Sequence, residues 1–164
     1  MGRFKEKRGF TLIELIIAVA LLAVAGTVAV RLFVHAHVNN RLAADIDRSV
    51  FYGTSWIERI KSSPGDWING NASALDPAVC ELDTCSYIVY YDEDWNPVRG
   101  GENRPQEAEY EIYIDLFRMT GSDRLWAIEL RTFKIEPYPL DSEPNREIHS
   151  LSALVNVTGE VTGP

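Results

Sequence analysis

The sequence predicts an α+β fold in which a long N-terminal helix packs on a four-stranded antiparallel sheet. Three observations carry this prediction. The N-terminal region holds a long apolar run, apolar residues continue at helical spacing after it, and four later segments alternate apolar and polar residues. The first proline of the chain is Pro64, so nothing obligatory breaks the helix before that point.

The apolar run covers residues 10–30 and is long enough to cross a membrane. Its 21 residues give a helix of about 31 Å, close to the hydrocarbon thickness of a bilayer. No charge occurs from Leu15 to Val30. Residues 1–9 carry a net charge of +3, whereas Arg31 alone follows the run closely. The positive-inside bias therefore predicts a cytoplasmic N-terminus and an extracytoplasmic remainder.

A single acid, Glu14, interrupts the apolar run. A carboxylate at the centre of a membrane helix costs roughly 2.5–3.5 kcal/mol, and acids in such helices are rare and usually functional. A secretory signal peptide is an alternative interpretation, because Ala23 and Ala25 before Gly26 form a possible cleavage site. Glu14 argues against it, since an acid weakens the apolar core of a signal peptide. Helical spacing also continues past Val30.

Residues 31–63 are predicted to continue the helix as an amphipathic segment. An apolar stripe recurs at helical spacing, polar residues occupy the other faces, and Ser-Ser-Pro-Gly at 62–65 ends the helix. A coiled-coil seam is the alternative explanation of the stripe. The stripe consists of Val34, Val38, Leu42, Ile46, Val50, Trp56, Ile57 and Ile60.

Residues 64–164 are predicted to form a globular head that holds the sheet. The stretch 62–83 is rich in Pro, Gly, Asn, Asp and Ser, which predicts a connecting loop. Thr120–Asp123 is a candidate hairpin turn, and the proline-rich segment Glu136–Asn145 is predicted to be a crossover loop. The predicted strands have period two and lie at residues 87–91, 109–116, 125–131 and 150–157, with a phase shift or bulge suggested by Phe133 and Ile135.

The segment Arg8-Gly9-Phe10-Thr11-Leu12-Ile13-Glu14 resembles the processing and methylation site of type IV pilins and pseudopilins. The resemblance extends from Lys7 to about Val30. It implies that a prepilin peptidase cuts between Gly9 and Phe10, which makes residues 1–9 a leader peptide, and that the same enzyme methylates Phe10. Glu14 would then pair with the amino terminus of an adjacent subunit and set the axial register of the filament.

The same resemblance implies a pilin-like fold and a structural role, with residues 10–30 as a transmembrane and filament-core helix. The filament would be a type IV pilus, a type II secretion filament or a DNA-uptake filament, and the sequence does not separate these systems. The irregular, proline-rich head favours a minor pilin or minor pseudopilin. Many major pilins carry a proline late in the membrane helix, and this chain departs from them there.

The partners implied by the resemblance are other pilins or pseudopilins, bound through the N-terminal helix, the prepilin peptidase, the inner-membrane assembly platform and membrane lipid. The implied location is the inner or cytoplasmic membrane, with the head outside the cytoplasm, and then a periplasmic or cell-surface filament. The competing interpretation is a secreted or membrane-anchored extracytoplasmic binding domain with no filament role.

The composition argues against direct binding of nucleic acid. The chain has a net charge of −8, and removal of a leader of charge +3 would bring it to −11. An acidic domain is repelled by the phosphate backbone. The sequence also contains no nucleophile elbow, phosphate loop, HExxH or CxxC motif. We therefore expect a protein that is not an enzyme and has no cofactor.

Two cysteines, Cys80 and Cys85, lie in the segment that the topology places outside the cytoplasm, where disulfides persist. Four intervening residues can close a small ring if the backbone turns, so a disulfide between them is predicted. A metal site is not predicted there, because no further Cys or well-placed His completes a ligand set.

Asp92, Asp94 and Asn96 match the first three ligand positions of an EF-hand-type calcium loop. Pro97 stands where such a loop requires glycine, and Asn103 stands in place of its terminal acid. The resemblance keeps calcium as a weak candidate, because some pseudopilins bind calcium in a loop of the β-region. A surface hairpin turn rich in Asp and Asn is the favoured interpretation.

Overall fold

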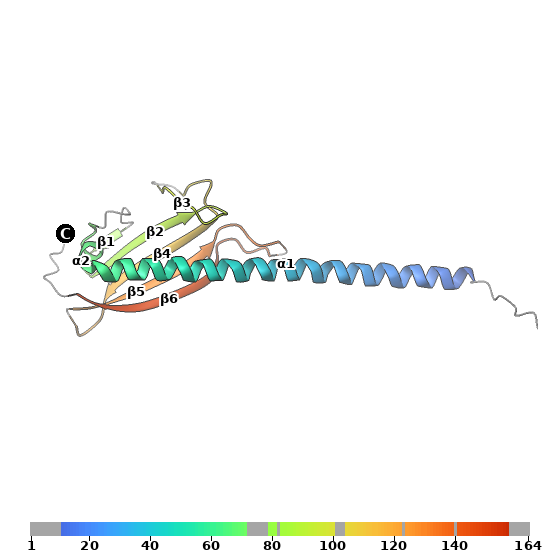
Figure 1. Ribbon diagram of the computed structural model, residues 1–164, viewed down its shortest axis with the longest axis horizontal. Coiled ribbons are helices and arrows are strands. Elements are labelled where there is room, and N and C mark those ends of the chain that lie inside the picture. Colours follow the sequence, from blue (N-terminus) through green and yellow to red (C-terminus); the bar gives the residue numbers. More distant parts are fainter. Residues whose placement is uncertain are drawn as a thin grey trace, which may run out of the picture. The chain divides into compact units, whose positions relative to one another are not determined.

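The computed structural model describes residues 11–71, 79–81, 83–100, 104–122, 124–139 and 141–157. A long helix, α1 (Leu12–Ser62), and an antiparallel sheet give the α+β fold that the sequence predicts (Figure 1). The chain divides into two compact units between Asn40 and Arg41. The first unit contains the N-terminal part of α1. The second unit contains the rest of α1 and the whole sheet.

The sheet has six strands, so the prediction of four was incomplete. The two additional strands pair with opposite ends of one edge of β2. They have three and two residues, too few to show an alternating pattern in the sequence. The predicted strands are β2 (Thr84–Tyr91), β4 (Tyr110–Arg118), β5 (Leu125–Lys134) and β6 (Arg146–Asn156), and the additional ones are β1 (Val79–Glu81) and β3 (Pro97–Val98).

The strands follow one another as an antiparallel meander in the order β1-β2-β4-β5-β6. The turn between β4 and β5 contains Gly121 at a φ of 88°, a conformation that glycine adopts without steric cost. The segment Glu136–Asn145 joins β5 to its direct antiparallel neighbour β6. It is therefore a long hairpin loop, and the prediction of a crossover was wrong.

The predicted connecting loop after α1 begins with a short second helix, α2 (Pro64–Ile68). Pro64 occupies its first turn, where a backbone N–H would have no intrahelical partner. The helix directs Trp67 and Ile68 into the core, and the hydroxyl of Tyr87 on β2 donates a hydrogen bond to the carbonyl oxygen of Trp67. This contact holds α2 against β2 of the sheet.

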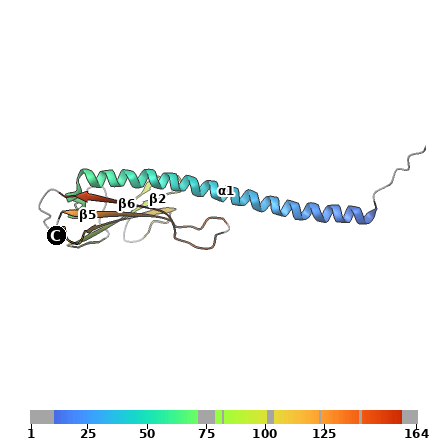
Figure 2. The ribbon, with the colours of Figure 1, turned by 90° about the horizontal axis from the view of Figure 1, so that it is seen from below.

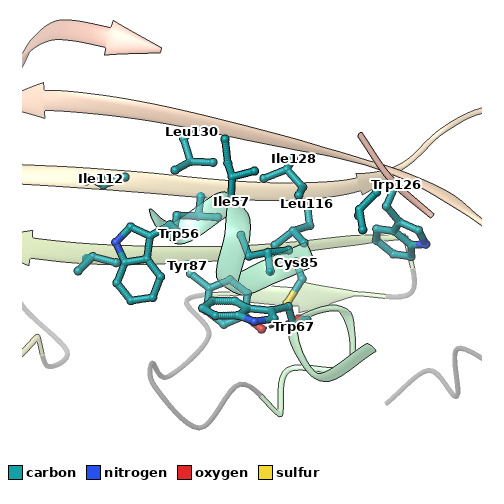
Figure 3. Packing of buried hydrophobic residues seen from close by; sticks show 14 of the residues in the cluster. Trp56, Ile57, Trp67, Cys85, Tyr87, Ile112, Leu116, Trp126, Ile128 and Leu130 are labelled. Carbon is teal, nitrogen blue, oxygen red and sulfur yellow. Dashed lines mark hydrogen bonds between the residues drawn. The ribbon is translucent and has the colours of Figure 1, made fainter. Parts of the chain in front are cut away.

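In the second unit, α1 runs along one face of the sheet (Figure 2). Trp56, Ile57 and Ile60 of the helix are buried, as the apolar stripe predicts, and they lie among the inward side chains of β2, β4 and β5 (Figure 3). Val50, also assigned to the stripe, is exposed instead. The helical spacing continues the buried face toward the N-terminus through three small or polar residues, Gly53, Ser49 and Asp45.

Gly53 lets α1 approach the sheet closely. A β-carbon at this position would lie 2.7 Å from Cδ1 of Leu151 on β6. The helix and the sheet therefore touch at a point where the helix has no side chain, and Leu151 fills the space.

The sequence suggested a phase shift or bulge near Phe133 of β5, and the structure places the additional residue in the neighbouring strand β6. The β5–β6 register shifts between Thr132 and Phe133, and the additional residue is Ile148 of β6. Strand β5 keeps its alternation, with Thr132 and Lys134 both pointing to the buried face. The apparent change of phase in the sequence arises because these two inward residues are polar.

Candidate functional site

Glu14 lies in the first turn of α1, where it caps the helix together with Thr11. The backbone N–H and the hydroxyl of Thr11 donate to Oε2 of Glu14 at 2.8 and 2.9 Å. In return, the backbone N–H of Glu14 lies 3.4 Å from the hydroxyl oxygen of Thr11. This is the reciprocal arrangement of a capping box, with Thr11 as N-cap and the acid three residues later. The negative charge also faces the positive end of the helix dipole.

The helix that follows Glu14 exposes its apolar side chains on all sides. Large apolar residues from Leu12 to Val30 are at least 53% exposed. An 18-residue window of α1 has a mean hydropathy of 2.6 and no buried residue, so the helix is long and apolar enough to cross a membrane. The hydroxyl of Thr27 donates to the carbonyl oxygen of Ala23 at 2.8 Å, so it needs no outside partner. Such a surface requires lipid or other apolar helices around it.

Residues 4–30 match the prokaryotic N-terminal methylation motif. The chain carries the prepilin-type N-terminal motif characteristic of type IV pilins and pseudopilins. The match includes Gly9, Phe10 and Glu14. Of these, Gly9 and Phe10 lie outside the described residues, and Glu14 lies in the helix cap. Together with the apolar helix, the prepilin motif supports membrane anchoring and a structural role. No curated protein and no solved structure matches the chain significantly.

Outside the prepilin motif, the two cysteines are direct partners in the β1–β2 hairpin. Cys80 is paired with Cys85 in the register of the two strands, with their Cα atoms 4.1 Å apart, and the two side chains are joined as a disulfide. Cys85 is buried in the core. The disulfide thus ties the short edge strand β1 to the sheet.

The acidic segment after β2 forms a turn, which hydrogen bonds to the carboxylate of Asp92 hold together. Oδ1 of Asp92 accepts the backbone N–H groups of Asp94 and Asn96 at 3.0 and 2.8 Å, and Oδ2 accepts the side-chain amide of Asn96 at 3.1 Å. These bonds, first those from Asn96, hold the pKa of Asp92 below its ordinary value. Among the described residues, no group of three His, Cys, Asp or Glu side chains is arranged to hold a metal ion.

The turn places Trp95 in the core at a φ of 64°, which is unusual for a residue other than glycine. Its ring stacks on Tyr52 of α1 at 5.5 Å and on Tyr110 of β4 at 4.4 Å between ring centroids. The Asp and Asn residues that resemble calcium ligands therefore shape a turn whose central residue joins helix to sheet.

A buried polar cluster joins α1 to the sheet beside this aromatic stack. Asp45 of α1 is 3% exposed, and its two carboxylate oxygens accept the hydroxyls of Tyr110 and Tyr138 at 2.9 and 2.6 Å. One turn later, the hydroxyls of Ser49 and Thr132 are hydrogen-bonded at 2.8 Å. A buried carboxylate is tolerated when donors satisfy its oxygens, and here two phenols do so.

Lys134 supplies positive charge to the same cluster. It is 2% exposed and forms an ion pair with Glu109. Its Nζ lies 4.6 Å from the ring centroid of Tyr110 and 5.2 Å from that of Tyr138, so the ammonium faces both phenol rings that donate to Asp45. We call Asp45, Tyr110, Tyr138, Lys134 and Glu109 the Asp45 cluster. The negative charge of Asp45 on α1 and the positive charge of Lys134 on β5 are thus linked through the two tyrosines, and the two charged groups do not contact each other directly.

Proposed function

We propose that this chain is a structural subunit, a minor pilin or minor pseudopilin, of a type IV pilus, a type II secretion filament or a DNA-uptake filament. The prepilin motif at residues 4–30 is the observation that carries the proposal. The exposed apolar side chains of the N-terminal helix support it, because a filament core or a bilayer would cover that surface.

In the proposed maturation, the prepilin peptidase cuts after Gly9 and methylates Phe10. The chain is first inserted in the inner or cytoplasmic membrane with residues 1–9 in the cytoplasm. An assembly platform then moves it into a filament, where the α1 helices of neighbouring subunits pack together and the head stays outside the cytoplasm. The +3 charge of residues 1–9 supports this orientation.

Glu14 is proposed to set the register between neighbouring subunits. Both bonds from Thr11 end on Oε2, and among the described residues Oε1 accepts no hydrogen bond. The carboxylate can therefore hold its own helix cap and still accept a bond from the amino terminus of an adjacent subunit. A charge buried in a filament core needs such a partner, because unpaired burial is costly.

Mass spectrometry of the N-terminal peptide tests the proposal most directly. The chain is isolated from membranes of cells that express its own filament system, and an N-methylated Phe10 is expected. A Gly9→Val variant should keep Met1 or a later leader residue, because the peptidase of the resembling family cuts after this glycine. Gly2→Val, in the same leader, should be processed normally. A mature start at Gly26 would support a signal peptide and overturn the proposal, and an uncut wild-type chain would also overturn it.

A second measurement separates a filament subunit from an anchored binding domain. Surface filaments or periplasmic filaments are sheared or released, and the chain is sought in them. Recovery of the processed chain with the other filament subunits is expected. A processed chain that stays entirely in the membrane fraction while filaments form without it would favour the binding domain.

A further inference from the structure

A group of basic side chains follows the apolar run of α1. The run ends at Val30, and Arg31, His35 and His37 come within the next seven residues. All three residues are exposed, and none of them forms a hydrogen bond or an ion pair with another side chain among the described residues. The helix continues unbroken through this segment, so its backbone is satisfied and only the side chains are free to bind. We call Arg31, His35 and His37 the Arg31 group.

The rise of the helix places the Arg31 group at the depth of lipid headgroups. Each residue advances a helix by about 1.5 Å, so residues 31–37 extend from the end of the apolar run to about 10 Å past Val30. The polar region of one bilayer leaflet is roughly 5–8 Å thick beyond the hydrocarbon. When the apolar run crosses a membrane, Arg31 and His35 therefore lie within this region and His37 lies at its outer edge.

The charge of the segment favours an anionic surface. The chain contains no Asp or Glu between Glu14 and Asp45, and the guanidinium of Arg31 is always charged. A histidine donates at least one ring N–H even when it is neutral, so His35 and His37 can add hydrogen bonds to phosphate or glycerol oxygens. Basic side chains next to a membrane are attracted by anionic lipids. The segment therefore differs from the rest of an acidic chain.

The directions of the three side chains favour lipid over a protein partner. A helix turns by about 100° per residue, so His35 lies about 40° from Arg31 around the helix axis. His37 lies about 160° from His35 by the same geometry and therefore faces nearly the opposite side of α1. One protein surface covers one side of a helix, whereas headgroups surround a helix that crosses a bilayer. A single lipid environment can thus serve the whole group.

Apolar side chains within the same segment extend the contact with lipid. Leu32 and Phe33 follow Arg31 directly and are 65% and 77% exposed. Exposed apolar side chains next to a membrane-crossing run gain free energy by contact with acyl chains. An arginine at this boundary can lay its apolar stem along the acyl chains and keep its guanidinium among the phosphates.

We propose that Arg31, His35 and His37 bind the headgroups of anionic phospholipids, such as phosphatidylglycerol. Arg31 supplies the charge, and the two histidines donate hydrogen bonds on opposite sides of the helix. The bound lipid holds the unassembled chain at a fixed depth in the membrane, and it is released when the helix leaves the bilayer. This inference rests on the membrane stage of the proposed function and does not depend on the filament stage.

Native mass spectrometry of the full chain tests the lipid preference. The chain is reconstituted in nanodiscs of equimolar phosphatidylcholine and phosphatidylglycerol with identical acyl chains. It is then transferred to a non-ionic detergent, and the ratio of bound phosphatidylglycerol to bound phosphatidylcholine is measured. Residues 1–9 are also basic and can bind anionic lipid. The effect of the Arg31 group is therefore read as the difference between each variant and the wild type, which share that segment.

The wild type is expected to retain more phosphatidylglycerol than phosphatidylcholine. Arg31→Gln should lower the ratio about fivefold, the factor that corresponds to roughly 1 kcal/mol for one arginine at an anionic surface. The triple variant with His35→Ala and His37→Ala added should lower it further. Arg31→Lys keeps the charge and should retain most of the preference. Arg48→Gln is the matched control and should behave as the wild type, since Arg48 is exposed on the same helix but stands 18 residues past Val30.

Three results would overturn the proposal. The first is a wild type without preference for phosphatidylglycerol. The second is a wild-type ratio in the triple variant, and if that variant were also lost from sheared filaments, the group would bind an acidic partner subunit instead. The third is an equal loss in Arg48→Gln and Arg31→Gln, which would reflect charge at any position. These measurements use the unassembled chain, so a negative result is separate from the test of N-methylation at Phe10.

Discussion

The hydroxyl oxygen of Tyr138 lies 2.6 Å from Oδ2 of Asp45, although 93 residues separate the two in the chain. Tyr138 belongs to the long hairpin loop between β5 and β6, and Asp45 belongs to α1. This bond therefore holds the loop against the helix. The hydroxyl of Tyr110 on β4 donates a second hydrogen bond to the same carboxylate. The helix α1 is thus attached to the sheet by hydrogen bonds at Asp45 and by apolar packing near its end, where Ile60 is fully buried.

Asp45→Ala is expected to destabilise the second unit by about 2–4 kcal/mol. It leaves the hydroxyls of Tyr110 and Tyr138 without an acceptor, and each unsatisfied buried group costs roughly 1–3 kcal/mol. Urea unfolding of the full chain in micelles, followed by near-ultraviolet circular dichroism, measures the effect. Asp47→Ala, two residues along the same helix and exposed, is the control and should stay within about 0.5 kcal/mol. Equal losses in the two variants would contradict the anchoring role of Asp45.

Alkaline pH is expected to weaken the fold through its buried tyrosines, Tyr87, Tyr91, Tyr110 and Tyr138. Burial raises the pKa of Tyr87 to about 12, and burial, aided by Asp45, raises the pKa of Tyr110 and Tyr138. An unfolded tyrosine loses its proton near pH 10. Between that pH and the folded pKa, the unfolded chain holds fewer protons than the folded one. The free energy of unfolding therefore falls as pH rises past about 10, and the stabilisation is fully present at lower pH.

Phenolate absorbance during a pH titration measures this effect. The chain contains seven tyrosines, and the half-buried ones should ionise before the fold is lost. The remainder should ionise together with the loss of near-ultraviolet dichroism, and Tyr138→Phe should reduce that second step. Ionisation of all seven near pH 10, with the fold intact, would show that the burial of these phenols does not protect them.

Variants at Thr11 and Glu14 are expected to separate helix capping from subunit register. Gln can occupy the third position of a capping box, so Glu14→Gln keeps the cap and removes the charge. Thr11→Ala keeps the charge and weakens the cap by about 0.5–2 kcal/mol. If the charge sets the register, Glu14→Gln loses incorporation into sheared filaments, whereas Thr11→Ala retains most of it. The reverse result would assign the role of Glu14 to the helix end alone.

Reduction of the Cys80–Cys85 disulfide is expected to lower the free energy of unfolding by about 2 kcal/mol, the chain-entropy value for so short a loop. Urea unfolding with and without dithiothreitol measures the loss. The Cys80→Ala/Cys85→Ala double variant is the control, since the reductant should leave it unchanged. Alkylation of the untreated, denatured chain should modify neither cysteine, and modification of both would rule out the disulfide.

The four longer strands and the helix could be predicted because their patterns are periodic. In β4, for example, Ile112 and Ile114 are buried while Tyr113 and Asp115 are partly exposed, as period two requires. The capping pair was not predicted, although Thr11 and Glu14 stand three residues apart at the start of the apolar run, which is the spacing of a capping box.

The Asp45 cluster could not be predicted, because its signal lies in pairings between distant segments. Asp45 and Ser49 are polar residues on a helix, and Thr132 and Lys134 are polar residues on a strand, so each indicates exposure when taken alone. Their burial becomes favourable only when the fold provides hydrogen-bond partners. The contacts of Arg104 with Glu111 and Asn145 could not be predicted for the same reason, since the three residues are far apart in the sequence or lie in different elements.

The distribution of tryptophan has a practical consequence. All four tryptophans of the chain, Trp56, Trp67, Trp95 and Trp126, are buried in the second unit, and the helix up to Asn40 contains none. Intrinsic fluorescence is therefore an optical signal of that unit alone. Transfer of the N-terminal helix between lipid, detergent and neighbouring helices should leave the emission unchanged, whereas opening of the sheet should shift it to the red.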